Sequence, residues 1–282
     1  MKKKVDLHIH SVYSDSDLTP QEIFLCAKKM NLSAIAITDH DTIESFPQAY
    51  QLSKEFNIEF IPGIEISCEY KGEEVHILGY FIDGDNKTLQ NALKDVKELR
   101  KNRLIKMAKR ANQIGLRVDV DELLEKVKNK IATRLHLALY LLETNQVNSL
   151  QEAFQRFLSP KSPLYIAGFK FSVKEAITLI KEAEGVASLA HPHFLSSPEE
   201  LIKKFCDWGL DALEVVYPRF TPSMVEYFIQ LATKYRLLAT GGSDSHGSFK
   251  EFTHIGTLEV PYLWVENLKN ARERYIIYKK NI

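Results

Sequence analysis

The chain has few cysteines, no long apolar run and no net charge. Its three cysteines, Cys26, Cys68 and Cys206, lie far apart and form no Cys-x-x-Cys pair, so we expect reduced core thiols rather than disulfides. No run of 18 apolar residues is present, which argues against a transmembrane helix. The lysines of residues 1–4 lead into an apolar strand pattern rather than a signal-peptide core, so we expect a cytoplasmic protein.

The charged residues are unevenly distributed. Residues 1–93 contain 8 basic and 15 acidic residues, whereas residues 94–134 contain 13 basic and 6 acidic residues. An acidic segment beside a basic one favours a cation site with an anion-attracting neighbour. Long solvated helices produce similar charge runs, so this pattern alone does not decide the function.

Strand and helix patterns alternate along most of the chain and predict an α/β protein. Strands are predicted over residues 4–9, 33–38, 58–67, 74–82, 186–190, 211–216 and 237–241, and from residue 86 to 157 only helical patterns occur. Seven strands alternating with helices favour a parallel sheet closed, or nearly closed, into a barrel. We therefore expect a barrel of residues 1–85 and 165–282, and an all-helical insertion domain of residues 86–164 capping the active site.

Candidate metal ligands occur at the ends of these strands. His8 and His10 lie two residues apart on the first strand and would point to one face. Carboxyl ends of parallel barrel strands meet at one face, so ligands far apart in sequence can converge there. A lone His-x-His pair is more typical of core or surface histidines than of a metal site. Here, however, six of the nine histidines lie on predicted strands or at their carboxyl ends. The candidates are His8, His10, Asp15, His40, Glu65, His76, His191, Asp244 and His246.

The motifs around these residues resemble those of the PHP (polymerase and histidinol phosphatase) family of phosphoesterases, and most of all its TrpH-like branch of nucleotide phosphatases and 5′-3′ exoribonucleases. The resemblance covers residues 4 to about 260 and includes the insertion. It departs at Ser16, where that branch often has glycine. The matching segments are Asp6-Leu7-His8-Ile9-His10-Ser11, Thr38-Asp39-His40-Asp41-Thr42, Pro62-Gly63-Ile64-Glu65, His76-Ile77-Leu78-Gly79-Tyr80, Ala132-Thr133-Arg134-Leu135-His136, Ala190-His191-Pro192-His193 and Gly242-Ser243-Asp244-Ser245-His246.

The resemblance implies a distorted seven-stranded (β/α)7 barrel of PHP type with an all-helical insertion, and two to three divalent metal ions. One ion would bind His8, His10, Glu65 and Asp244; Glu65 would bridge to a second ion on His76 and His191; Asp15, His40 and His246 would hold the third. Imidazole and carboxylate ligands suit Mn²⁺, Fe²⁺ or Zn²⁺, and the family favours Mn²⁺. A hydroxide between the ions would attack phosphorus in line.

The resemblance also implies that Arg134 and His193 are catalytic residues that contact the substrate phosphate. An arginine fork binds phosphate oxygens in pairs, and His193 is either a supporting residue or a general acid for the leaving alcohol. Tyr217 and Arg219 follow the sixth strand and are candidate contacts to a base or a second phosphate, although a packed tyrosine and a solvated arginine fit equally well. We expect Asp39 to orient a ligand histidine.

The expected activity is hydrolysis of nucleotide phosphate esters: the 5′- or 3′-phosphate of mononucleotides, nucleoside 3′,5′-bisphosphates or short 5′-phosphorylated RNA. No aromatic residue lies between Phe81 and Tyr140, so the basic segment lacks a stacking surface for long single strands. One alternative is a phosphatase for a metabolite such as histidinol phosphate. Another is a metal-dependent amidohydrolase, which usually needs a bridging lysine at the end of the fourth strand, where none is found. The sequence indicates no membrane or protein partner.

Overall fold

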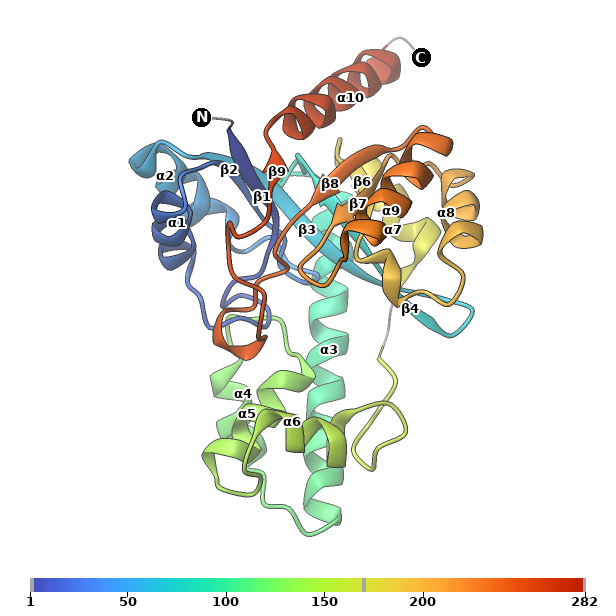
Figure 1. Ribbon diagram of the computed structural model, residues 1–282. Helices are drawn as coiled ribbons and strands as arrows, with labels where there is room; N and C mark the ends of the chain where they lie inside the picture. The colour runs from blue at the N-terminus through green and yellow to red at the C-terminus, as the bar shows by residue number, and fades with distance from the viewer. Residues whose placement is uncertain (1–2, 169–170, 281–282) are drawn as a thin grey trace.

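A computed structural model describes residues 3–168 and 171–280. Figure 1 shows a curved sheet with helices on its outer side, and a separate group of helices on one side of it. The described strands form one sheet in the order β8-β7-β6-β4-β3-β2-β1-β9, with β5 beside β3. They are β1 (Lys4–Ile9), β2 (Leu32–Ile37), β3 (Glu59–Tyr70), β4 (Glu73–Tyr80), β5 (Phe171–Ser172), β6 (Val186–Leu189), β7 (Ala212–Val216), β8 (Leu238–Gly241) and β9 (Val260–Pro261).

The sheet closes almost completely between its first strand and the segment that follows β8. The Ile9 backbone forms a parallel bridge with Ser245, and the amide of His10 donates to the Ser245 carbonyl over 2.9 Å. The arrangement is the nearly closed α/β barrel that the sequence predicts. Strands β5 and β9 were not predicted, because two residues are too short to carry a periodic pattern.

Strand β4 differs from the expected parallel arrangement. It runs antiparallel to both β3 and β6, because the turn from β3 to β4 contains only Lys71 and Gly72. Both turn residues have positive φ angles, 51° and 84°, as a tight hairpin requires. Since β4 is reversed, its carboxyl end lies away from the ends of the parallel strands, and His76 extends from within the strand instead.

Helices cover the outer face of the barrel and form the separate group. They are α1 (Pro20–Lys29), α2 (Phe46–Phe56), α3 (Lys87–Gln113), α4 (Val120–Lys126), α5 (Arg134–Glu143), α6 (Leu150–Ala153), α7 (Val173–Glu182), α8 (Pro198–Cys206), α9 (Pro222–Lys234) and α10 (Leu263–Lys280). A π-helical turn (Phe154–Leu158) continues α6. Thr19 begins α1 with a reciprocal capping box to Glu22, which satisfies amides that the first helical turn leaves unpaired.

Helix α3 joins two hydrophobic cores. Its first half packs Leu89 and Val96 into the core between the sheet and its outer helices. Its second half packs Leu104 and Met107 into a core shared with α4–α6 and the chain up to Leu164. Figure 1 shows α3 leaving the barrel and running alongside the other helices of this group. We call residues 87–164 the helical segment.

Candidate metal centre

The nine expected ligands gather at one end of the barrel. His8 on β1 and His10, just after the end of β1, are fully buried, and their rings lie 5.2 Å apart. Three sets of side chains each bring their nitrogen or oxygen atoms within 4.8 Å of one another: His8, His10, Glu65 and Asp244; His10, Asp15, His40 and His246; and His40, Glu65 and His76. The first set coincides with the expected first group. The second set adds His10 to the expected third group. The last set contains Glu65 and His76 of the expected second group but has His40 in place of His191, whose Nε2 atom lies 3.0 Å from Glu65 Oε1.

Glu65 lies at the centre of this cluster. Its Oε1 atom is 2.9 Å from His76 Nδ1 and 3.0 Å from His191 Nε2. Its Oε2 atom is 3.2 Å from His8 Nε2 and 3.1 Å from His10 Nε2. The carboxylate therefore faces imidazoles on two sides, which is the geometry that a bridging ligand requires.

Several buried polar atoms of the cluster lack a hydrogen-bond partner within the described residues. They include both ring nitrogens of His10, Nδ1 of His40 and Oδ1 of Asp15. Leaving such atoms unsatisfied costs free energy, whereas a divalent cation would accept their lone pairs. The donor set, six imidazoles and three carboxylates without a thiolate, fits hard or borderline cations.

The charges of the cluster are strongly coupled. Burial opposes ionisation of Glu65 and Asp244, but the neighbouring histidines, and Lys250 in the case of Asp244, hold the pKa of both carboxyls well below the usual range. Burial lowers the pKa of His40 and His246 to about 4. These two imidazoles are therefore neutral at pH 7, the form that binds a metal.

Glu214 is a supporting residue that our sequence analysis missed. It lies on β7, is fully buried, and uses both carboxylate oxygens. Oε1 is 2.9 Å from His8 Nδ1, and Oε2 accepts the backbone amide of His191 over 2.6 Å. Glu214 thus fixes the orientation of two expected ligands. The sequence feature that could have revealed Glu214 is the position of this acidic residue inside the otherwise apolar run of residues 212–216.

Asp39 has a different role from the one expected. Its oxygens accept bonds from the amide and hydroxyl of Ser11 and from the hydroxyl of Ser14, each over 2.7 Å. It therefore orders the loop that carries Asp15, and the expectation that it orients a ligand histidine is wrong. Asp6 plays a similar part, since it accepts the amides of Ser243 and Gly256, each over 2.9 Å.

The loop after β8 approaches β1 very closely. A Cβ atom on Gly242 would lie 2.3 Å from the His8 amide nitrogen, so only glycine fits there. Two residues farther on, Asp244 has a φ of 49°, an uncommon conformation for a non-glycine residue. Such local strain is typical of functional sites.

Arg134 lies at a cavity of about 170 Å³ between the cluster of expected ligands and the helical segment. Asp15, His40 and His76 line this cavity together with Arg100, Arg103 and Arg134. Arg134 donates to the Leu158 carbonyl over 3.3 Å. Burial, and then the charges of Arg134 and Arg100, lower the pKa of Arg103 to about 10. Arg100 is already paired with Asp41, so Arg103 and Arg134 supply the unpaired positive charge beside the three expected ligands, and our sequence analysis identified only Arg134.

A second cavity, of about 280 Å³, opens on another side of the cluster. His191, Asp244, Phe194 and Lys250 are among the residues that line it. Lys250 forms an ion pair with Asp244 Oδ2, and its Nζ atom lies 3.2 Å from the Tyr217 hydroxyl.

The remaining expected contact residues lie beside this second cavity. Tyr217 is buried, and its hydroxyl donates to Asp244 Oδ2 over 2.8 Å. The His193 ring lies 5.0 Å from those of Tyr217 and Phe220. Burial, followed by the charges of His191, Arg219 and Lys250, lowers the pKa of His193 to about 4. Arg219 is exposed.

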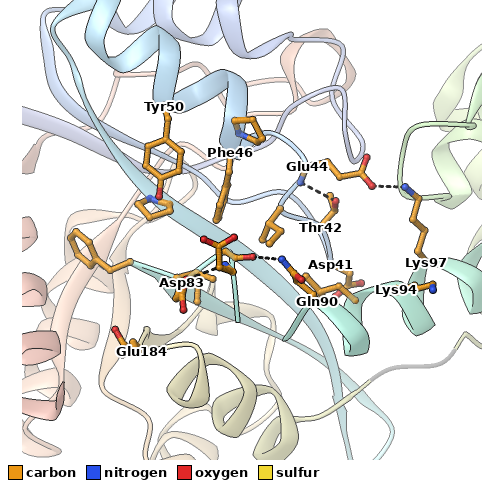
Figure 2. Close-up of a pocket in the computed structure, with 18 of the residues that line it drawn as sticks. Asp41, Thr42, Glu44, Phe46, Tyr50, Asp83, Gln90, Lys94, Lys97 and Glu184 are labelled. Carbon is orange, nitrogen blue, oxygen red and sulfur yellow. Dashed lines mark hydrogen bonds and ion pairs between the residues drawn. The ribbon is translucent and has the colours of Figure 1, made fainter. Parts of the chain in front are cut away.

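A larger cavity, of about 1030 Å³, lies elsewhere. Figure 2 shows it between α2, the loop after β4 and α3, with Tyr50 and Phe46 on one side. It contains none of the nine expected ligands, and its Lys97 pairs with Glu44. Its size would make this cavity a candidate functional site, but the expected metal ligands line the two smaller cavities.

Comparison with known families agrees with this assignment. A family model described as PHP domain matches residues 6–161, more than half of the chain. The chain belongs to the PHP domain family. Within the described part of this PHP protein, no helix is both long enough and apolar enough to cross a lipid bilayer.

Two similar curated proteins are enzymes. A 5′-3′ exoribonuclease from Haemophilus influenzae is 30% identical over 250 residues, covering 87% of this chain and 91% of that protein. A 3′,5′-nucleoside bisphosphate phosphatase from Chromobacterium violaceum is 28% identical over 260 residues, covering 90% and 91%. The prediction that this PHP protein is an enzyme that hydrolyses phosphate esters is confirmed.

Two solved structures share the whole fold. A proposed metal-dependent phosphoesterase from Bifidobacterium adolescentis has a TM-score of 0.88 and 29% identity, and covers 96% of both chains. An amidohydrolase from Chromobacterium violaceum, with bound sulfate and no metal, has a TM-score of 0.83 and 28% identity, covering 95% of this chain and 96% of that one. The predicted PHP-type barrel is therefore confirmed.

Proposed function

We propose that this PHP protein hydrolyses phosphate esters of nucleotides: mononucleotides, nucleoside 3′,5′-bisphosphates or short 5′-phosphorylated RNA. The observation that carries the proposal is the cavity shared by Asp15, His40 and His76 with three arginines. A phosphoryl group beside the cluster would leave further anionic groups of the substrate facing these arginines. The names of the curated relatives, an exoribonuclease and a bisphosphate phosphatase, support the same substrate class.

We assign the nine clustered side chains to two or three divalent ions, Mn²⁺ first, with Fe²⁺ or Zn²⁺ as alternatives. When bound, such ions lower the pKa of a water molecule and neutralise phosphoryl oxygens. Glu65 would face two ions, because its two oxygens lie near different imidazoles. Glu214 would hold His8 and His191 in the orientation that binding requires.

We assign phosphate binding to Arg134, whose planar fork matches phosphate oxygens. Arg103 is a further candidate, because it lines the same cavity. His193 is neutral at pH 7, since its pKa is about 4. We propose that it contacts the substrate phosphate, either as a supporting residue or as the general acid for the leaving alcohol. We keep Arg219, which is exposed, as a candidate contact to a base or a second phosphate of the substrate.

We further propose that the barrel consists of residues 1–85 and 165–282, and that residues 86–164 form an insertion domain that caps the active site. The separate core around Leu104, Leu137 and Leu158 supports this division. The insertion would supply Arg100, Arg103 and Arg134, and the barrel would supply the metal ligands.

A substrate panel with Mn²⁺ tests the proposal. We expect phosphate release from adenosine 3′,5′-bisphosphate, or stepwise nucleotide release from 5′-phosphorylated RNA, and the ratio of the two rates distinguishes a monoesterase from an exonuclease. Hydrolysis of histidinol phosphate alone would contradict the nucleotide assignment. Amide hydrolysis without phosphate release would indicate an amidohydrolase, although β4 (Glu73–Tyr80) contains no lysine.

A further inference from the structure

Phe194 is an exposed aromatic residue at the edge of the metal cluster. Its side chain is 60% exposed, and it ends the short 3-10 helix Pro192–Phe194. Phe194 lines the second cavity together with Glu65, His191 and Asp244. Several large aromatic side chains are exposed among the described residues, and of these Phe194 lines a cavity that contains expected ligands.

The Phe194 ring is held in place from behind. The His193 ring lies 3.9 Å from it at an interplanar angle of 35°, and the His191 ring lies 5.3 Å from it at 65°. His193 in turn packs on Phe220. The phenyl ring is therefore supported on the protein side while more than half of its surface remains open to solvent, so it presents a preformed apolar surface beside the cluster.

We propose that Phe194 is the stacking surface for the nucleobase of the substrate. Every base has a π-face, and aromatic side chains bind it with little sequence preference. In a nucleotide only one sugar separates the base from its phosphate. The ring of Phe194 lies 5.3 Å from the ring of the expected ligand His191, so a base on Phe194 can belong to the same nucleotide as a phosphate at the cluster. The base would occupy the second cavity, and further phosphates would face Arg100, Arg103 and Arg134 in the first.

This inference rests on the proposed function, because it assumes that the phosphoryl group lies at the cluster. It adds a substrate requirement that neither the cluster nor the arginines impose: the group attached to the phosphate must carry a planar ring. Sugar phosphates without a base should bind weakly, and the four bases should be accepted with similar affinity.

Binding of two phosphonate analogues to the Mn²⁺-loaded protein tests the inference. One is adenosine 5′-monophosphate and the other ribose 5-phosphate, each with a methylene in place of the ester oxygen, which prevents hydrolysis. By calorimetry, we expect Phe194→Ala to weaken binding of the adenosine analogue roughly 5- to 100-fold and to leave the ribose analogue unchanged. Phe194→Trp should retain binding of the adenosine analogue.

Phe252→Ala is the matched control, because Phe252 is 73% exposed and does not line this cavity. Equal binding of the two analogues by the unmodified protein, or an equal loss of both in Phe194→Ala, would overturn the inference. Hydrolysis in the substrate panel is a separate result: base-dependent binding without hydrolysis would contradict only the proposed reaction, and hydrolysis without base-dependent binding only the stacking surface.

Discussion

The barrel and the helical segment hold their functional side chains in different ways. In the barrel, His8 and His10 are completely buried, and the buried Glu214 fixes the orientation of His8. In the helical segment, Arg134 and Arg103 are partly exposed. They donate to the backbone carbonyls of Leu158 and Ile166, and each lies 5.7 Å from the centre of the Tyr165 ring. The contrast is between side chains fixed by buried contacts in the barrel and side chains with partly solvent-exposed contacts in the helical segment.

Asp244→Ala should produce the largest effect. Asp244 Oδ1 lies 3.3 Å from His8 Nε2 and 3.2 Å from His10 Nε2, so its loss should remove bound metal. Several kcal/mol of transition-state stabilisation would be lost, which lowers kcat by about a thousandfold or more. Elemental analysis and steady-state kinetics measure both effects. Asp207→Ala, at an exposed position, is the control, and full metal content in Asp244→Ala would refute the ligand assignment.

Glu214→Gln should reduce metal affinity by about 10- to 100-fold. Both oxygens of Glu214 interact with cluster residues, and an amide replaces one of these acceptors with a donor. Titration of the metal-free protein with Mn²⁺ should give a larger dissociation constant, and kcat should be largely recovered at saturating metal. If metal affinity is unchanged, Glu214 has only a packing role.

The metal-free barrel should lose stability as pH rises. Burial opposes protonation, but the carboxylates of Asp244 and Glu65, close to the ring, raise the pKa of His10 to about 9, and Glu65 raises that of His76 to about 10. Protons on these rings stabilise the folded state fully below pH 6.5, and the contribution disappears as pH rises through 9 to 10. Thermal unfolding in EDTA from pH 7 to 10 should show a falling Tm. Saturation with Mn²⁺ should weaken this dependence, because ligation replaces the protons.

Arg134→Ala should mainly weaken substrate binding. Loss of a charged hydrogen-bonding group costs about 1.5 kcal/mol or more, which corresponds to a rise in KM of about tenfold, while metal content stays constant. Arg134→Lys keeps the charge but not the planar fork, so it should recover activity only in part. Arg156→Ala is the control, since Arg156 is exposed and pairs with Glu152. An unchanged KM would show that Arg134, and with it the helical segment, does not contribute to substrate binding.

Tyr140→Phe should have the smallest effect. The Tyr140 hydroxyl donates to Glu122 over 3.0 Å and accepts the Asp119 amide over 3.1 Å, which joins α4 to α5. Its removal should lower the free energy of unfolding by about 1 kcal/mol without changing kcat. Urea denaturation monitored by circular dichroism measures the change. A large loss of kcat would show that the helical segment and the reaction centre are not as separable as the comparison implies.

The sequence indicated which residues gather because most of them lie just after strands, whose ends in a barrel converge, although His8, Glu65 and His76 lie within β1, β3 and β4. It failed where the deciding contact depends on a distant partner. The roles of Asp39 and Glu214 follow from hydrogen bonds to other segments, which local patterns do not encode. Arg100 and Arg103 looked like ordinary solvated residues of a long helix, and only the position of α3 brings them to the cluster. The reversal of β4 was readable in principle from its two-residue turn.

The continuity of α3 has a geometric consequence. Each residue of an α-helix advances 1.5 Å and turns the chain by about 100°, and α3 runs unbroken from the barrel core to the core that supports Arg134. One residue inserted between Val96 and Leu104 would therefore rotate the second half of α3, with the core packed on it, by about 100° around the helix axis relative to the nine ligands. If the proposed function is correct, the spacing within α3 sets the position of Arg134 relative to the nine ligands, and with it the place where a substrate phosphate can bind.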